Sequence, residues 1–384
     1  MFEALSHLAL QQYWWVIISL LGALLVFMMF VQGGQTLIGE VAKTDTQKDM
    51  AVNSIGRKWD LTFTTLVTFG GAFFASFPIF YATSFGGAYW LWMLILFTFI
   101  IQAISYEFRK KPSNFLGQKT YETFLFINGL FGSLLIGLAV GTFFTGAEFS
   151  IDQLRLTTPG NNVISRWETP LHGLGAVANI QNILLGLSVF FLARIQGALY
   201  FIDTIDDDMV IRKSRKQVQW NSIPFLLVFL SFMILLLTKE GFAVNPGTGG
   251  IYMEPCKYLN NYLQMPVVAI FLVVGVLSVL TGIAVTLFKQ SRRGIWFTGS
   301  GTVLAVLSLF FVAGFNNTAY YPSTFDLQSS LTIQNSSSSH YTLTAMSYVS
   351  LLMPIVIGYI WYTWRLMNRK NLSAEEMESG EHTY

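Results

Sequence analysis

Long uncharged apolar runs dominate the chain, and short polar segments separate each run from the next. A membrane-spanning helix needs about 20 predominantly apolar residues, and nine runs come close to that length. We therefore predict spans at approximately 12–34, 60–83, 87–106, 122–146, 176–201, 222–238, 265–288, 295–314 and 344–366, with a polar tail at 370–384. The predicted fold class is all-α, an integral membrane bundle of about nine transmembrane helices in a single domain, 1–384.

Composition supports a lipid environment, because 53% of the 384 residues are hydrophobic and only 11% are charged. Soluble domains carry about 25% charged residues. A soluble multidomain enzyme, a disordered chain and a disulfide scaffold are therefore excluded. The one cysteine, Cys256, permits no intrachain disulfide. We expect membrane lipid around the chain and no nucleic acid.

Basic residues predict the orientation of the bundle. Of the 23 Lys and Arg residues, 18 fall in the loops after spans one, three, five and seven and in the tail. Such residues concentrate on the cytoplasmic side. We therefore place the C-terminus in the cytoplasm and the N-terminus outside, which an odd number of spans requires.

Haem in a helical bundle usually needs His, Met or Cys side chains near the iron. The four histidines, His7, His172, His340 and His382, all lie outside the predicted spans. We predict no metal site in this chain and expect any associated haem to depend mainly on a partner.

Ionisable groups inside a membrane are candidates for function. Asp60 opens span two directly after Trp59, and Glu107 closes span three. Both lie at the expected cytoplasmic side, where facing carboxylates can pass protons inward. The alternative is helix-end stabilisation, in which Asp60 meets a helix dipole and Glu107 pairs with Arg109.

Two further residues are candidates for a site. Gln102 lies about one turn before Glu107, and Arg194 lies inside span five. Arg194 has two open interpretations: its guanidinium extends towards water, or it neutralises a carboxylate or a propionate of a partner's haem. We therefore interpret Arg194 as a charge partner of an acidic group.

Several strings, in order along the chain, resemble subunit II of the cytochrome bd-type quinol oxidases. They are Asn53-Ser54-Ile55 with Trp59-Asp60, Gly70-Gly71-Ala72 with Pro78, Glu107-Phe108-Arg109, Gln196-Gly197-Ala198 with Tyr200, Pro322-Ser323, Ser330-Leu331-Thr332 and His382-Thr383-Tyr384. Each string is weak alone, but their order together with nine spans is specific.

The resemblance implies a heterodimer in the bacterial plasma (inner) membrane whose haem-bearing subunit I oxidises quinol and reduces dioxygen to water. Haem b and haem d are then expected in subunit I, and the isolated chain is not expected to be catalytic. The resemblance leaves open a bound quinone and a small third subunit. Carried over by position, Trp59, Asp60 and Glu107 resemble residues of a cytoplasmic proton route, and Gln102 replaces a family arginine.

One departure from the family changes the expected route. Where members carry the acidic string D-G-F-D at the end of helix one, this chain has Gln32-Gly33-Gly34-Gln35. Gln and Thr side chains would then hold water where other members use charge. Catalytic residues are expected in the partner and none in this chain.

Two other classes of function stay open. A secondary transporter would show inverted repeats with paired broken helices, and the sequence has no convincing pair. A purely structural membrane scaffold would differ from the oxidase subunit only in having carboxylates that play no part in turnover.

Overall fold

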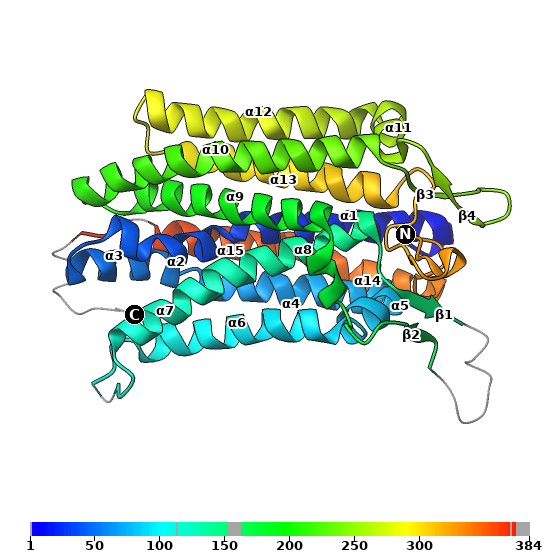
Figure 1. Ribbon diagram of the computed structural model, residues 1–384, viewed down its shortest axis with the longest axis horizontal. Coiled ribbons are helices and arrows are strands. Elements are labelled where there is room, and N and C mark those ends of the chain that lie inside the picture. Colours follow the sequence, from blue (N-terminus) through cyan, green and yellow to red (C-terminus); the bar gives the residue numbers. More distant parts are fainter. Residues whose placement is uncertain (1, 113, 153–162, 369–370, 374–384) are drawn as a thin grey trace.

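The computed structural model describes residues 2–112, 114–152, 163–368 and 371–373, and it shows long helices that run side by side (Figure 1). Within these residues eight helical segments are long and apolar enough to cross a membrane, and a bent pair of helices supplies up to one more crossing. The predicted all-α membrane bundle of about nine helices is confirmed. The predicted tail at 370–384 lies outside the described residues except for 371–373.

The elements alternate between long helices and short connecting segments. The α-helices are α1 (His7–Met28), α2 (Phe30–Val41), α3 (Asp45–Gly56), α4 (Trp59–Ser76), α5 (Pro78–Phe80), α6 (Tyr89–Phe108), α7 (Gln118–Ile127), α8 (Ser133–Thr145), α9 (Ile180–Thr204), α10 (Asp208–Thr238), α11 (Lys257–Gln264), α12 (Pro266–Phe288), α13 (Gly294–Gly314), α14 (His340–Ser350) and α15 (Met353–Met367). The π-helical segments are η2 (Tyr81–Gly86) and η3 (Asn128–Gly132), and the strands are β1 (Phe149–Ile151), β2 (Ser165–Trp167), β3 (Gly241–Val244) and β4 (Ile251–Glu254).

The bundle has two chemically different ends. The connections α2–α3, α3–α4, α6–α7, α9–α10 and α12–α13 gather at one end, which we call the basic end because it carries most of the lysines and arginines (Figure 1). The strands, α5 and α11 lie at the opposite end, which we call the strand end. There β1 pairs with β2 and β3 pairs with β4, both antiparallel. The connection between α8 and α9 therefore contains folded structure, the β1–β2 pair.

Span two is not one straight helix. The predicted span 60–83 is interrupted where α4 ends at Ser76, and the segment that begins at Pro78 turns away by 120°. Proline has no backbone N–H and its ring opposes a continuing helix. The chain consequently turns across the strand end through α5 and η2 before α6 returns.

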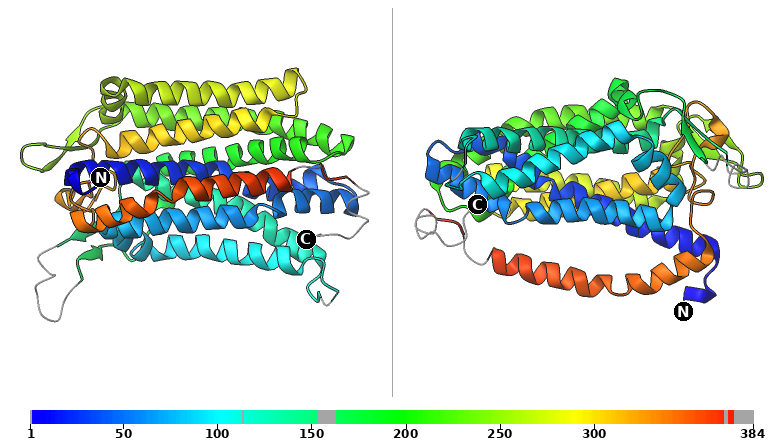
Figure 2. Two further views of the ribbon diagram at one scale, coloured as in Figure 1. Left: turned by 180° about the vertical axis from the view of Figure 1, so that it is seen from behind. Right: turned by 90° about the horizontal axis from the view of Figure 1, so that it is seen from below.

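The last crossing stands apart from the others. None of the residues of α15 is buried within this chain, and Figure 2 shows the helix separated from the rest of the bundle along most of its length. At the strand end α14 packs on α1 and α4, and at the basic end Asp206 N–H donates to Leu372 O at 2.9 Å. The α15 helix is therefore held mainly at its two ends.

Glycine permits a close helix contact between α2 and α9. A Cβ atom on Gly33 would lie 1.8 Å from the carbonyl oxygen of Ala193, and one on Gly197 would lie 2.3 Å from the backbone nitrogen of Gly34. Only residues without a side chain allow two helices to approach so closely. This contact fixes the distance between the polar side chains that flank it.

Replacing Gly33 by alanine should separate these helices and destabilise the protein by about 1–3 kcal/mol, because an added methyl group would overlap a backbone carbonyl. The measurement is thermal unfolding of the purified membrane protein in detergent. Gly39→Ala is the matched control, since Gly39 also lies in α2 and its added Cβ would have no neighbour within 4 Å. Equal melting temperatures for both variants would contradict the close contact.

Candidate functional site

A group of uncharged polar side chains lies inside the bundle near the basic end. Gln32 and Gln35 come from α2, Gln102 and Tyr106 from α6, and Asn128 from η3, and each is at most 2% exposed. The Gln32 amide donates to Gln102 Oε1 at 3.2 Å and to Asn128 Oδ1 at 3.4 Å, while the Gln35 amide donates to the Tyr106 hydroxyl at 3.1 Å. We call these five residues the amide cluster.

Helix geometry brings these side chains together. Gln32 and Gln35 are three residues apart, and Gln102 and Tyr106 are four apart, so each pair shares one face of its helix. The π-helical segment η3 carries Asn128 towards them, and Gly129 beside it lets the helices meet. A Cβ atom at Gly129 would lie 2.4 Å from Gln32 O. The cluster therefore sits where α2, α6 and η3 are packed too closely for larger residues.

Four atoms of the amide cluster have no hydrogen-bond partner among the described residues. They are Gln32 Oε1, Gln35 Oε1, Gln102 Nε2 and Asn128 Nδ2. Leaving a buried polar atom unpaired costs about 1–3 kcal/mol. Ordered water usually satisfies such groups in proteins. The cluster therefore has the chemistry of an internal water-binding site, without any charged side chain.

The sequence-predicted site residues divide between the cluster and the surface. Gln102 belongs to the amide cluster, and the half-buried Trp59 stacks on Tyr106 with ring centroids 5.8 Å apart and an interplanar angle of 14°. Asp60 and Glu107 are both exposed on this chain, on α4 and α6. The structure thus brings Trp59 and Gln102 to one buried site and leaves the two carboxylates at its outer side.

The alternative in which Glu107 pairs with Arg109 is not what the structure shows. Glu107 pairs with Lys111, one helical turn further along the chain. Arg109 is buried, and its side chain points towards α3 and α7. Its guanidinium donates to Asp49 on α3 at 2.8 Å and to Glu122 on α7 at 2.9 Å. Lys48 and Lys110 also pair with these carboxylates. This ion cluster joins three elements of the basic end, and the sequence spacing alone gave no signal for it.

Arg194 finds its charge partner within this chain. Its guanidinium donates to Glu40 Oε1 and Oε2 at 3.0 and 3.1 Å, to Thr36 Oγ1 at 3.0 Å and to Asn221 Oδ1 at 2.7 Å. Arg194 on α9 therefore connects α2 to α10. Sequence reasoning missed Glu40, although its spacing of four and eight residues from Thr36 and Gln32 was a readable sign of one polar helix face.

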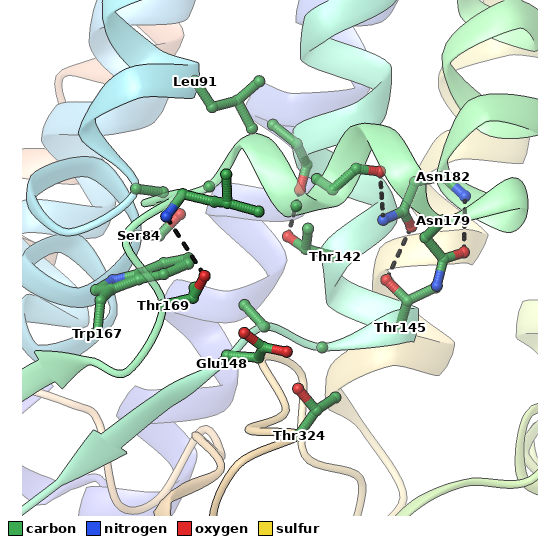
Figure 3. Close-up of a pocket in the computed structure, with 18 of the residues that line it drawn as sticks. Ser84, Leu91, Thr142, Thr145, Glu148, Trp167, Thr169, Asn179, Asn182 and Thr324 are labelled. Carbon is green, nitrogen blue, oxygen red and sulfur yellow. Dashed lines mark hydrogen bonds between the residues drawn. The ribbon is translucent and has the colours of Figure 1, made fainter.

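A separate pocket of about 330 Å³ opens at the strand end (Figure 3). Trp167, Thr169, Glu148 and Thr324 lie along one side, with Asn179 and Asn182 opposite. The remaining lining includes Leu91, Trp92, Ala139, Thr142 and Tyr321.

Local hydrogen bonds fix the walls of this strand-end pocket. The Trp167 indole donates to Thr83 O at 2.8 Å, and Asn179 caps the start of α9 by accepting from the Gln181 backbone N–H at 2.9 Å. Burial raises the pKa of Tyr321 to about 12, so its phenol stays protonated near neutral pH. The pocket therefore combines hydrogen-bonding groups with apolar walls.

The described histidines lie at the strand end rather than in the middle of the bundle. His7 begins α1 and His340 begins α14, and the centroids of their rings lie 6.1 Å apart. In each ring the Nε2 atom contacts a backbone carbonyl oxygen. His172 lies beside Gly87. Across the residues described, no group of three or more His, Cys, Asp or Glu side chains is arranged to hold a metal ion. These positions do not fit axial ligation of a haem inside this bundle.

Comparisons with known proteins agree along nearly the whole chain. The family model described as cytochrome bd terminal oxidase subunit II matches residues 10–367. Cytochrome bd-I ubiquinol oxidase subunit 2 of Escherichia coli K12 is 25% identical, with 99% of each chain covered. Cytochrome bd ubiquinol oxidase subunit 2 of Bacillus subtilis 168 is 24% identical, covering 96% of this chain and 98% of its own length.

A solved structure supports the same fold. The bd oxidase from Geobacillus thermodenitrificans contains a chain that matches with a TM-score of 0.60 at 13% identity, covering 94% of this chain and 99% of that one. At 13% identity this similarity supports the arrangement of the helices alone.

Breaking the ion cluster should destabilise the basic end. Arg109→Gln leaves Asp49 and Glu122 without their buried guanidinium, and removing one partner of a buried pair costs about 3–5 kcal/mol. Thermal unfolding in detergent measures this loss. Lys111→Gln is the control, because it breaks an exposed pair worth about 0–1 kcal/mol. A melting temperature for Arg109→Gln as high as that of Lys111→Gln would contradict the assignment.

Proposed function

We propose a function for this chain from one premise, that it belongs to the cytochrome bd terminal oxidase subunit II family. It is accordingly a multi-pass subunit of a terminal oxidase, an oxidoreductase complex of the bacterial inner membrane. The transporter interpretation is set aside by this membership.

The haems belong to a partner in this proposal. A haem-bearing subunit I would carry haem b and haem d, oxidise quinol and reduce dioxygen to water. The placement of His7, His172 and His340 at the strand end supports this division, because none of them lies where an axial ligand within the bundle would have to be. The isolated chain would then have no oxidase activity.

The task proposed for this chain is to carry protons from the cytoplasm towards the partner. The basic end would face the cytoplasm, as the distribution of lysine and arginine favours. Water molecules bound at the four unpaired amide atoms would form a hydrogen-bonded chain through the bundle. Amide side chains do not change charge, so the water carries the proton while the amides hold it in place.

Trp59, Asp60, Gln102 and Glu107 have separate roles in this route. Gln102 binds water within the amide cluster, and Trp59 holds the Tyr106 ring by stacking on it. Asp60 and Glu107, exposed on α4 and α6, supply carboxylates at the outer side of the cluster. The single observation that supports the route most strongly is the set of unpaired buried amide atoms.

Substitutions along the route should slow turnover while the haems stay in place. Gln102→Leu removes an amide that binds water, and we expect quinol-dependent oxygen uptake by the two-subunit complex to fall by about tenfold or more. Asp60→Asn and Glu107→Gln remove carboxylates that exchange protons, and each should also slow uptake. The measurement is oxygen consumption, read together with the optical spectrum of the haems.

Gln219→Leu is the control for these variants. Gln219 is exposed on α10 and lies outside the amide cluster. Wild-type uptake in Gln102→Leu would remove the amide cluster from the proton route. Wild-type uptake in both carboxylate variants would leave the chain as a structural scaffold at those positions.

A bound quinone is a second proposal, and the strand-end pocket supports it. A volume of about 330 Å³ is at the lower end of the range for small-molecule sites. Hydroxyl and amide groups there can bond to the oxygens of a quinone ring, and Leu91 and Trp92 offer apolar contact. The pocket would hold a quinone that is distinct from the one oxidised in subunit I.

Filling the pocket should remove this quinone. Ala139 lies on the pocket wall, and Ala139→Phe would occupy the space that the ring needs. The quinone content of the purified complex, extracted and separated by chromatography, should fall relative to the wild type. Leu263→Phe, at an exposed position on α11, is the control. An unchanged quinone content in Ala139→Phe would place the quinone elsewhere or exclude it.

A further inference from the structure

One face of α2 carries polar residues from the interior to the surface. Gln32, Thr36 and Glu40 follow each other at intervals of four residues, so their side chains lie along one side of the helix. Gln32 is fully buried in the amide cluster, and Thr36 is 2% exposed. The Glu40 side chain is 43% exposed. A titratable group at the surface thus lies on the same face of α2 as Gln32 of the proposed water site.

Arg194 holds this surface carboxylate in one position. The guanidinium touches both Glu40 oxygens and the Thr36 hydroxyl, and Asn221 accepts from its Nε at 2.7 Å. Only 11% of the Arg194 side chain is exposed. Because Gly33 lies against the backbone of Ala193, α9 cannot move away from α2 without breaking their contact. Glu40 and Thr36 are therefore kept as neighbours of the same cation.

We propose that Glu40 is the proton-collecting residue at the basic end, that Arg194 is its positioning residue, and that Thr36 links it to the amide cluster. This inference rests on the proposed proton route and adds a residue to it. A proton from hydronium or a buffer acid binds a Glu40 oxygen and gives a neutral carboxylic acid. The acid then passes its proton to a water molecule beside the Thr36 hydroxyl, and the carboxylate pairs with Arg194 again.

The charges around Glu40 come from each element that packs on α2. Arg194 is the charged group that α9 contributes. Lys43 follows α2, with its Nζ donating to Gly39 O at 3.2 Å, and Lys213 of α10 lies near Lys43. On α7, Glu122 is already occupied by Arg109 and Lys48. Arg194 is therefore the charged group that contacts Glu40 directly, and Lys213 interacts with both Lys43 and the Asp207 carboxylate.

The test compares Glu40→Gln, Glu40→Asp and Asp206→Asn in the assembled two-subunit oxidase. Glu40→Gln keeps an oxygen for Arg194 but cannot accept a proton, whereas Glu40→Asp can. Asp206→Asn is the matched control, because Asp206 is an exposed carboxylate at the basic end that pairs with Arg292. The readout is quinol-dependent oxygen uptake across a range of pH, with the haem spectrum as the measure of assembly.

We expect Glu40→Gln to lower uptake about tenfold at about pH 8.5, where protons are scarce, and much less at about pH 6. Glu40→Asp should keep the shape of the wild-type pH profile, and Asp206→Asn should match the wild type throughout. A role for Glu40 that is only structural would not produce this dependence on pH.

Parallel measurement of Gln102→Leu separates this inference from the route itself. A wild-type pH profile in Glu40→Gln, with slow turnover in Gln102→Leu, would overturn the role of Glu40 and leave the route standing. Wild-type behaviour in both would overturn the two together. If the Glu40→Gln complex does not assemble, the Thr36→Val variant tests the inference instead. It removes the linking hydroxyl and one hydrogen bond of Arg194, but keeps the Glu40 carboxylate and both of its bonds to Arg194. Slowed uptake with a wild-type haem spectrum supports the inference, and unchanged uptake overturns it.

Discussion

Polar atoms buried within a membrane bundle need a hydrogen-bond partner, because lipid and apolar side chains offer none. In this protein the buried polar groups of the basic end fall into two arrangements. The guanidinium groups of Arg109 and Arg194 are surrounded by carboxylates and other oxygen atoms of the same chain. The amide cluster, by contrast, leaves four buried atoms unsatisfied by the described residues. The first arrangement stabilises the ends of helices, and the second creates places where water is the natural partner.

These two arrangements depend on the same helix contacts. Gly33 and Gly197 bring α2 against α9, which sets Arg194 beside Thr36 and Glu40. Gly129 brings η3 against the other side of α2, which sets Asn128 beside Gln32. Glutamine at positions 32 and 35 leaves the interior of the cluster without charge. The charged pair at Glu40 and Arg194 lies nearer the surface, where ionised groups cost less to hold.

Much of this architecture could be predicted from the sequence, because a membrane imposes length and hydropathy on each span. The nine predicted spans each overlap a long helix, and the family resemblance was confirmed. Local departures from regular helix were not predictable in the same way. Pro78 marked the break in span two, but its 120° bend depends on the packing of the strand end. The strands were missed because β1 and β2 contain only three residues each.

Predicting the candidate site from the sequence was less successful, because pairing between helices depends on how they rotate and pack. Gln102 was identified as unusual and proved to be buried in a polar cluster, and Arg194 proved to have a carboxylate partner. Asp60 and Glu107 were named as carboxylates that could face each other, and both lie exposed on this chain, on α4 and α6. The partners of Arg109, Asp49 and Glu122, lie on two other helices, α3 and α7, whose rotation the span pattern does not predict. Spacing along one helix is readable from sequence, whereas spacing between helices is not.

Central to the proposed route is that the amide cluster binds water and so lets protons cross the buried part of subunit II without a charged side chain. A cryo-EM map of the two-subunit complex, at a resolution that shows ordered water, tests it most directly. The account predicts water density within hydrogen-bonding distance of Gln32 Oε1, Gln35 Oε1, Gln102 Nε2 and Asn128 Nδ2. Amide side chains that pair only with one another or with the protein backbone, in a cluster without water, would contradict it.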